Sequence, residues 1–373
     1  MESIVALSLF DGISCGQLAL QRAGIPVSVY YASEIDKKAM AVTTKNFPKT
    51  VHLGDVKNWK SWDFSEYGPP DLIIGGSPCQ GFSHSGKGLN FKDPRSKLFF
   101  DFVDIINHFN PKYFLLENVG MKSDWEDIIS KHMGVEPIKI DSALVSAAHR
   151  RRNYWTNIPG VSAPADKNIN LSSIFSSYSA RFNPNGVLWN AGYIVGRKLN
   201  AKGKREDYNK NLKYIQCFQV RKQQKKFNCL TTVQKDTVLI ALDPGRYPDA
   251  YTKYTKDVDW RYLSAEEVEQ LMTLPHGYTS VKINNSFIAE SSRHKMCGNA
   301  WTVDVISHIF DSIVNSTHTW NGTKWVLNTH PMERADEFKE FIKKSREEES
   351  EKNRNEKEAV ITKQLRELAG EDK

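Results

Sequence analysis

Residues 3–16, SIVALSLFDGISCG, decide the fold, because a continuous apolar run leads there directly into a glycine-containing turn. The run over residues 3–9 predicts a strand that is buried on both faces, as in the middle of a parallel sheet. Gly12 and Gly16 bracket a turn into a helical stretch, GQLALQRAG, for which Gly24 is the predicted end. The segment therefore has the strand, loop and helix of an α/β unit.

The same alternation of strand and helix continues downstream. Apolar runs at 27–33 (VSVYYAS), 71–76 (DLIIGG) and 112–118 (KYFLLEN) predict further strands, and residues 97–109 carry apolar side chains at helical spacing. Alternating elements of this kind predict an α/β fold with a doubly wound, mostly parallel sheet.

A change of composition follows the α/β pattern. Residues 161–260 are basic and rich in Asn and Gly and contain no clear βαβ unit, so we predict a smaller second domain there. Helical patterns return at 263–274, where Ser264 and Glu267 form a predicted capping box, and at 301–314.

The excess of positive over negative charge lies in the middle of the chain. Residues 161–260 hold 17 Lys and Arg against 8 Asp and Glu, and the charged segment 333–373, a predicted exposed helical tail, holds 11 against 13. The clusters RKLNAKGKR at 197–205 and RKQQKK at 221–226 are interleaved with tyrosines and phenylalanines. Such segments are typical of nucleic-acid contacts, although a solvated surface that serves solubility explains a single cluster equally well.

The composition excludes several classes of protein. With 40% hydrophobic and 25% charged residues in 373, the chain is neither disordered, collagenous nor stapled by disulfides. Its start lacks the basic region of a signal peptide, and the first apolar run is too short to span a membrane, so we expect a soluble intracellular protein. No C-x-x-C pair occurs among the cysteines, which indicates a reducing compartment and no zinc knuckle; they are Cys15, Cys79, Cys217, Cys229 and Cys297.

The loop FDGISCG at 10–16 is a candidate cofactor site. The first amides of a helix lack partners and bind polar groups, and glycine lets a ligand approach the backbone. The loop lacks the G-x-G-x-x-G pattern, while Glu34 at the end of the next predicted strand suits a ribose diol and Asp55 could accept from an adenine amino group. An adenosine-type cofactor without a diphosphate is indicated, with a plain structural turn as the alternative.

Cys79 is a candidate nucleophile. It follows a predicted strand in GGSPCQGFS and so lies at the carboxyl end of a parallel sheet, where α/β folds place their sites. A thiolate is a strong nucleophile when its pKa is lowered. The alternative role, a small buried apolar residue, suits Cys217 and Cys229 better.

Glu117, Arg150 and Arg152 are candidate partners of Cys79. Glu117 ends the next predicted strand among apolar neighbours, where burial disfavours the charged carboxylate, so it could donate a proton; a helix cap is its alternative role. Arg150 and Arg152 are two residues apart and would share one side of an extended segment. Arginine side chains bind phosphate and carbonyl oxygens.

With these residues in place, the sequence resembles the DNA (cytosine-5)-methyltransferases. The phrases SLFDGI, ASE, GDV, GGSPC, ENV and VSAAHRRR are similar to the de novo branch, and the likeness resumes with an LS-x-E-E segment and with GNAWTV at residue 298. Ser8 and Ala148 replace an acidic residue and a glutamine that are common in the family, and both replacements also resemble the de novo branch.

The resemblance implies a class I, Rossmann-like methyltransferase fold with four segments. Residues 1–160 would form the catalytic domain, 161–260 an inserted target-recognition domain, 261–332 a return to the catalytic domain and 333–373 a charged helical tail.

The resemblance also implies roles for individual residues. Cys79 would attack C6 of a cytosine flipped out of duplex DNA, because C6 cannot be reached inside a stacked helix. Glu117 would hold the N3 and N4 edge of the base, Arg152 would contact O2, and Arg150 would support the site or a nearby phosphate. The implied cofactor is S-adenosyl-L-methionine, with no metal. Its expected contacts are Phe10, Asp11, Gly12, Ile13, Ser14, Cys15, Glu34, Ile35, Asp55, Val56, Pro78, Leu98, Asn299 and Ala300.

We therefore expect a monomeric DNA cytosine methyltransferase that serves DNA modification or restriction-modification in a prokaryote or a cell infected by its virus, with no membrane partner. A tRNA methyltransferase is the first alternative, and the long basic middle of the chain disfavours it. A catalytically silent DNA-binding relative is the second, and the intact Cys79, Glu117 and Arg152 disfavour it.

Overall fold

The computed structural model describes residues 2–77, 97–175, 189–202, 204–220, 226–241, 251–253, 260–316, 319–320 and 325–326. Pro78, Cys79 and the predicted tail at 333–373 lie outside the described residues.

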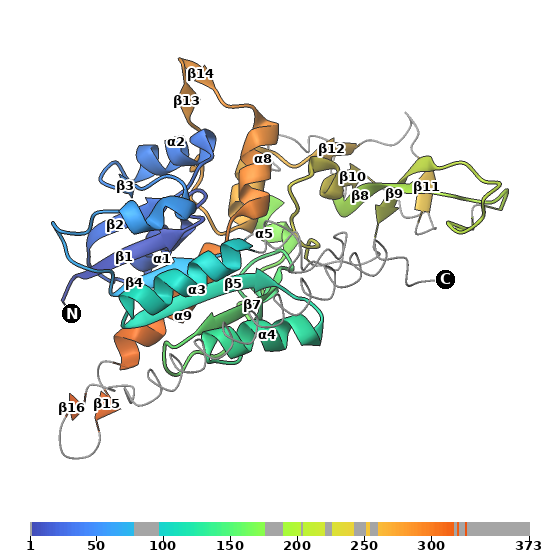
Figure 1. Cartoon of the computed structure of the whole chain (residues 1–373). Coiled ribbons are helices and arrows are strands. Elements are labelled where there is room, and N and C mark those ends of the chain that lie inside the picture. Colours follow the sequence, from blue (N-terminus) through green and yellow to red (C-terminus); the bar gives the residue numbers. More distant parts are fainter. Residues whose placement is uncertain are drawn as a thin grey trace, which may run out of the picture.

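A seven-stranded sheet forms the centre of the molecule, in the order β3-β2-β1-β4-β5-β7-β6 (Figure 1). The first five of these strands in spatial order run parallel, whereas β7 is antiparallel to both β5 and β6. This arrangement confirms the predicted α/β fold with a mostly parallel sheet. The strands are β1 (Ile4–Leu9), β2 (Val27–Ser33), β3 (Val51–His52), β4 (Leu72–Gly75), β5 (Tyr113–Val119), β6 (Ile138–Asp141) and β7 (Arg151–Thr156).

Helices cover both faces of this sheet, as the doubly wound prediction requires. On β1, Leu7 packs into a hydrophobic cluster with α3 and α4, while its neighbour Ala6 packs into a second cluster with α1 and α9. The strand is thus buried on both faces because successive side chains point to opposite sides. The helices are α1 (Cys15–Arg22), α2 (Lys37–Asn46), α3 (Lys97–Phe109), α4 (Ser123–Met133), α8 (Glu290–Asn299) and α9 (Val303–Ser316).

The C-terminal part of the described chain returns to the first helix. Helix α9 packs beside α1, and an ion pair of 2.6 Å joins Arg22 to Asp304. Helix α7 (Ala265–Leu271) begins with the predicted capping box, in which Ser264 and Glu267 each accept a hydrogen bond from the other's backbone amide. The hairpins β13 (Lys282–Ile283) with β14 (Ser286–Phe287) and β15 (Thr319–Trp320) with β16 (Trp325–Val326) complete this part.

The middle of the chain forms a separate antiparallel sheet, in the order β11-β9-β8-β10-β12, which extends away from the parallel sheet in Figure 1. Its small core consists of Ile194, Phe218, Val238 and Ile240, against which Trp260 packs. The domain boundaries expected from the sequence stay a prediction. The strands are β8 (Trp189–Arg197), β9 (Ile215–Val220), β10 (Val238–Ala241), β11 (Tyr251–Lys253) and β12 (Trp260–Tyr262), and a short helix α5 (Leu171–Phe175) precedes them.

Within the part of the chain that the structure describes, no helix is both long and apolar enough to cross a membrane.

Candidate active site

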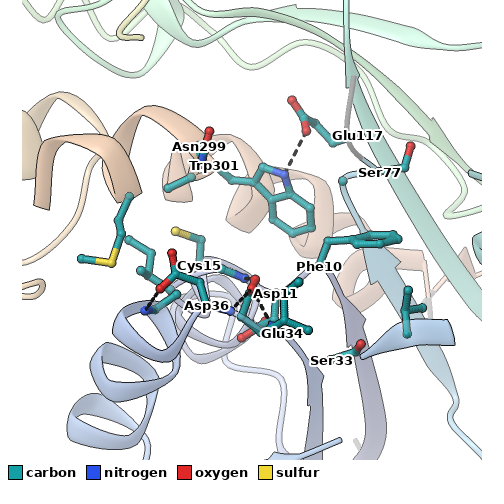
Figure 2. A pocket seen from close by; sticks show the side chains of 18 of the residues that line it. Phe10, Asp11, Cys15, Ser33, Glu34, Asp36, Ser77, Glu117, Asn299 and Trp301 are labelled. Atoms are coloured by element: carbon teal, nitrogen blue, oxygen red, sulfur yellow. Dashed lines mark hydrogen bonds between the residues drawn. The ribbon is translucent and has the colours of Figure 1, made fainter. Parts of the chain in front are cut away.

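A cavity of about 470 Å³ lies at the C-terminal ends of the parallel strands (Figure 2). Residues from the ends of β1, β2, β4 and β5 line it, together with the segment that connects α8 to α9. The structure brings most of the predicted site residues together here. Those that line the cavity are Phe10, Asp11, Gly12, Ile13, Cys15, Glu34, Ile35, Asp55, Val56, Leu98, Glu117, Arg150, Arg152, Asn299 and Ala300.

One predicted residue, Ser14, does not line the cavity, and two others are not among the described residues. Ser14 is fully buried and does not line the cavity; its hydroxyl donates to Asp11 and lies 3.0 Å from the Thr43 hydroxyl. Ser14 therefore supports the loop from beneath, which corrects its expected direct contact with a cofactor. Pro78 and Cys79 lie outside the described residues, and Ser77 is the last described residue before them.

The glycine loop is held in an unusual backbone conformation. Phe10, Gly12 and Ser14 all have positive φ angles of 56–61°, which are rare for residues other than glycine. Glu34 stabilises this loop, because its Oε2 accepts the Gly12 amide at 2.8 Å. Its Oε1 accepts the backbone amides of Ile35 and Asp36 at 2.7 and 2.8 Å. The Glu34 carboxylate is thus already fixed by three donors and presents its remaining lone pairs to the cavity.

Buried polar groups lie under the same loop. Burial raises the pKa of Asp11, although hydrogen bonds from Ser14 and from Tyr30, whose hydroxyl donates at 2.8 Å, oppose this effect. Burial also raises the pKa of the Cys15 thiol to about 12, so this cysteine stays protonated at neutral pH. Cys15 is therefore a packing residue of the loop and not a second nucleophile.

Asp55 lies near Glu34 on the cavity wall. It caps a short 3-10 helix, Val56–Ser61, and its Oδ1 accepts the Lys57 amide at 3.0 Å. Val56 is buried beside it, and the side chain of Ile35 is 70% exposed. A flat ring could lie with its faces against the side chains of Val56 and Ile35 and with the polar atoms of its edge toward Asp55.

A buried ion pair forms the other end of the cavity. Glu117 ends β5, and its Oε1 accepts a hydrogen bond from Arg152 Nε at 2.8 Å. Its Oε2 accepts from the indole of Trp301 at 3.1 Å. The alternative role of Glu117 as a helix cap is wrong, because Lys122 occupies the N-cap of α4.

Arg152 lies between Glu117 and Cys229. Burial opposes its charged form, but Glu117 and Cys229 raise the pKa of Arg152 above its ordinary value. The Cys229 Sγ lies 3.9 Å from both terminal nitrogens of Arg152, so Cys229 is not the plain apolar residue expected from the sequence. Cys217, in contrast, is fully buried as expected.

Arg150 is buried and supports the site from behind. Burial lowers the pKa of Arg150, and its Nη1 donates to the carbonyls of Leu230 at 3.4 Å and Gly298 at 3.2 Å. It thereby joins the start of β7 to the segment before α9.

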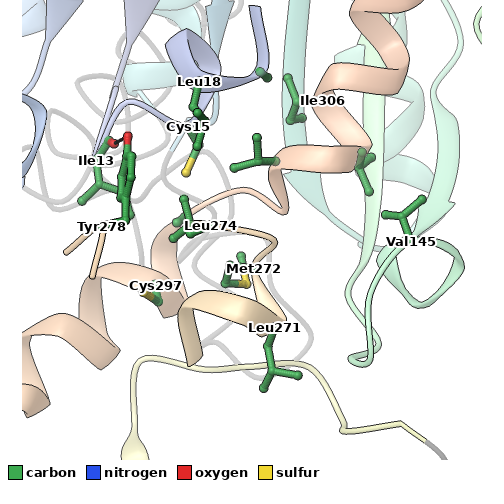
Figure 3. Close-up of a cluster of buried hydrophobic side chains, with 14 of the residues drawn as sticks. Ile13, Cys15, Leu18, Val145, Leu271, Met272, Leu274, Tyr278, Cys297 and Ile306 are labelled. Atoms are coloured by element: carbon green, nitrogen blue, oxygen red, sulfur yellow. Dashed lines mark hydrogen bonds between the residues drawn. The ribbon is translucent and has the colours of Figure 1, made fainter. Parts of the chain in front are cut away.

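The site also contains residues that are not predicted from the sequence. Asn118 donates through Nδ2 to the carbonyl and hydroxyl of Ser77 at 3.3 and 3.2 Å, which fixes the strand end next to Cys79. Tyr278 donates to the Ile13 carbonyl at 2.7 Å from a segment 265 residues away (Figure 3). Trp301 also contributes, as described above. Asn118 and Trp301 belong to the phrases ENV and GNAWTV, whereas nothing local marks Tyr278.

Among the described residues, no group of three or more His, Cys, Asp or Glu side chains is placed to hold a metal ion.

Comparison with known proteins identifies the parallel-sheet part of the chain. Residues 4–127 match the family model of the C-5 cytosine-specific DNA methylases. The orphan methyltransferase M.Rho11sI of Bacillus phage rho11s is 36% identical over 220 residues, which are 53% of this chain and 43% of that protein. The type II methyltransferase M.NgoPII of Neisseria gonorrhoeae is 42% identical over 116 residues, or 31% of this chain and 33% of that protein. The matches thus span less than half the length of these curated relatives.

Solved structures share the fold at low sequence identity. A putative DNA modification methyltransferase encoded within a prophage of E. coli superposes with a TM-score of 0.52 and 19% identity, over 84% of this chain and 99% of that one. The methyltransferase EhMeth of Entamoeba histolytica superposes with a TM-score of 0.56 and 15% identity, over the same shares. The family match over residues 4–127 confirms the resemblance to the C-5 cytosine-specific DNA methylases that is seen in the sequence. The solved structures show the same fold.

Proposed function

We propose that the protein is an S-adenosyl-L-methionine-dependent DNA (cytosine-5-)-methyltransferase. The observation that carries the proposal is the continuity of the cavity: Glu34 and Asp55 lie on the same surface as Glu117 and Arg152. A group bound at the first pair can therefore reach a base bound at the second without leaving the protein.

The residues of the cavity fit the cofactor. The Glu34 carboxylate is fixed by three amides and suits a ribose diol, and Asp55 beside Val56 and Ile35 suits an adenine ring. When bound, the cofactor supplies an electrophilic methyl group. The backbone of Phe10–Cys15 would support the part of the cofactor nearest to the base.

The proposed chemistry begins with Cys79. Its thiolate forms a bond to C6 of a flipped cytosine while Glu117, at the N3 edge, supplies a proton to N3. C5 thereby becomes an enamine carbon that can take the methyl group. Loss of the C5 proton to a base then expels the thiolate, and N3 returns its proton to the Glu117 carboxylate, which restores the neutral ring. Arg152 is placed beside Glu117 to contact O2, and Arg150 supports it.

The names of the relatives favour DNA over RNA, since they are an orphan phage methyltransferase and a type II methyltransferase. In the middle of this chain, the loop between β8 and β9 exposes Lys202, Lys204, Lys210 and Lys213, and its Tyr208 is completely exposed. We propose that this loop lies along the duplex.

Lys226 does not belong to the basic surface that we expect to face DNA. The ammonium group of Lys226 donates to the Ala143 carbonyl and lies 3.5 Å from Asp166, and its side chain is only 14% exposed. Lys226 therefore joins the middle segment to the catalytic part and does not contribute a phosphate contact. The other lysines of that cluster, Lys222 and Lys225, lie outside the described residues.

The test is transfer of tritium from labelled S-adenosyl-L-methionine to duplex DNA and, in parallel, to tRNA. We expect DNA to be methylated, and DNA that carries 5-fluorocytosine should trap a covalent adduct, because fluorine cannot leave as a proton. Cys79→Ser should abolish transfer and trapping, because an alcohol is a far weaker nucleophile than a thiolate.

Cys217→Ser is the matched control, since Cys217 is buried in the antiparallel sheet away from the cavity. It should retain both transfer and trapping. Methylation of tRNA alone would favour the RNA alternative. Activity of Cys79→Ser within tenfold of the parent would overturn the assignment of the nucleophile.

A further inference from the structure

Trp301 makes a polar contact that has no role in the chemical steps proposed above. Its indole Nε1 donates to Glu117 Oε2 at 3.1 Å, as Figure 2 shows. Arg152 Nε donates to Glu117 Oε1 at 2.8 Å. Each oxygen of the carboxylate thus has its own side-chain donor. The Glu117 side chain is only 10% exposed, so water contributes little to holding it.

The backbone around this contact leaves space for it. A Cβ atom at Gly76, directly after β4, would lie 2.9 Å from Glu117 Oε2 and 3.1 Å from Trp301 Nε1. A residue other than glycine would therefore separate the two groups. The absence of a side chain at Gly76 is what lets the indole and the carboxylate meet.

The other end of Trp301 is anchored to the cofactor loop. A Cβ atom at Gly16, in the first turn of α1, would lie 3.4 Å from Cζ3 of the indole ring. The backbone of Trp301 also lies near the Cys15 thiol, because it opposes the rise in the pKa of this thiol that burial causes. Trp301 therefore reaches from the first turn of α1 to Glu117. It lines the cavity between the end with Glu34 and Asp55 and the end with Glu117 and Arg152.

We infer that Trp301 is a positioning residue that, together with Arg152, fixes the orientation of the Glu117 carboxyl group toward the base. For its catalytic consequence the inference rests on the proposed function. Two donors on different oxygens prevent rotation of the carboxyl plane, and this plane must align with the N3 and N4 edge of a cytosine. With Arg152 alone, the carboxyl could still turn about the remaining contact.

The contact itself can be tested without any activity. In protein labelled with ¹⁵N-tryptophan, the indole N–H resonance of Trp301 is identified as the one missing in Trp301→Phe. We expect this resonance to move upfield and to exchange faster with solvent in Glu117→Ala, because its acceptor is gone. An unchanged resonance would overturn the inference whatever the enzyme does.

The catalytic consequence is tested by Trp301→Phe, which keeps an aromatic ring and removes the N–H. The single-turnover rate of methyl transfer should fall by about 10- to 100-fold, the range for a hydrogen bond to a charged group. The dissociation constants for cofactor and DNA should change by less than about twofold, because the contact is made to Glu117 and to neither ligand.

Two comparisons separate positioning from a general structural role. Trp62→Phe is the matched control, because the buried Trp62 indole N–H has no partner among the described residues, and it should leave the rate unchanged. In a Glu117→Gln background, Trp301→Phe should have less than about a twofold further effect, since the two residues act as one unit.

A full additional loss in that background, or a loss confined to cofactor affinity, would overturn the positioning role. A parent protein that methylates nothing would instead overturn the proposed function, and the indole resonance would still decide whether the contact exists.

Discussion

At the carboxyl edge of the seven-stranded sheet, each functional carboxylate is held by several donors: Glu34 by three amides and Glu117 by Arg152 and Trp301. On the five-stranded sheet, the loop between β8 and β9 presents Lys204 and Lys210 to solvent. The first region arranges charge inside the protein, and the second displays charge outside it.

This difference sets the size of the effects that mutations should have. A buried charged group that loses one partner incurs most of the desolvation penalty, so single changes at the sheet edge should cost orders of magnitude. Exposed charges are screened by salt and act additively, so changes in the loop should be small and should depend on ionic strength.

The largest expected effect is that of Glu117→Gln. The amide cannot give a proton to N3, so the rate of methyl transfer should fall by about 100- to 10,000-fold, the range for a general acid or base. Single-turnover transfer of labelled methyl groups measures it. Glu136→Gln, which changes an exposed carboxylate outside the cavity, should transfer at the parental rate. A loss below tenfold for Glu117→Gln would remove Glu117 from the proton transfer.

The next effect concerns the support of the glycine loop. Glu269 is fully buried and accepts the amides of Gly277 and Thr279 and the guanidinium of Arg293, at 2.7, 2.7 and 2.9 Å. This cluster holds the segment from which Tyr278 donates to the Ile13 carbonyl.

Glu269→Ala should therefore lower the free energy of unfolding by about 3 to 5 kcal/mol, the range for breaking a buried ion pair. Urea denaturation followed by circular dichroism gives the value. Glu266→Ala removes the more exposed partner of Arg293 and should cost about 1 kcal/mol or less. If the two variants lost the same free energy of unfolding, burial of Glu269 would not be the cause of its larger expected effect.

A smaller effect is expected for Glu34→Ala, which should weaken cofactor binding by about 1.5 to 3 kcal/mol. Weaker cofactor binding would also have a second explanation. The carboxylate accepts three backbone amides, so its removal also loosens the glycine loop. Calorimetry with S-adenosylhomocysteine and with its 2′,3′-dideoxy form separates the two. If Glu34 binds the diol, the loss should vanish with the dideoxy compound, whereas a persistent loss would assign Glu34 to the loop alone.

The two regions also differ in how far the sequence predicts them. The apolar patterns predict residues 27–33 and 97–109 with the bounds that β2 and α3 have, because strand and helix periodicity are local properties. The capping box at Ser264 and Glu267 likewise follows from spacing alone. In the middle segment, β8 has the sequence WNAGYIVGR, in which two glycines interrupt any alternation, so the pattern predicts no strand there.

Within the site, the sequence predicts the residues but not their contacts. The cavity wall gathers strand ends that the α/β pattern places at one edge, so Glu34 and Glu117 could be expected there. The contacts of Trp301 with Glu117 and of Lys226 with Ala143 join residues 184 and 83 positions apart. No local pattern encodes such pairs, because they depend on how the returning chain packs.

The smallest expected effect belongs to the exposed loop. If Lys204 and Lys210 bind phosphates, changing both to alanine should lower the slope of log affinity against log salt by about 0.9 for each phosphate that is no longer neutralised. Cofactor affinity should stay unchanged. Lys49→Ala with Lys112→Ala is the matched control, since these exposed lysines precede β3 and β5 at the opposite edge of the sheet. Fluorescence anisotropy of a labelled duplex, titrated at several salt concentrations, gives both slopes. Equal slopes for the two double variants would mean that the loop is a solvated surface, and a steeper response to tRNA than to duplex DNA would favour the RNA alternative.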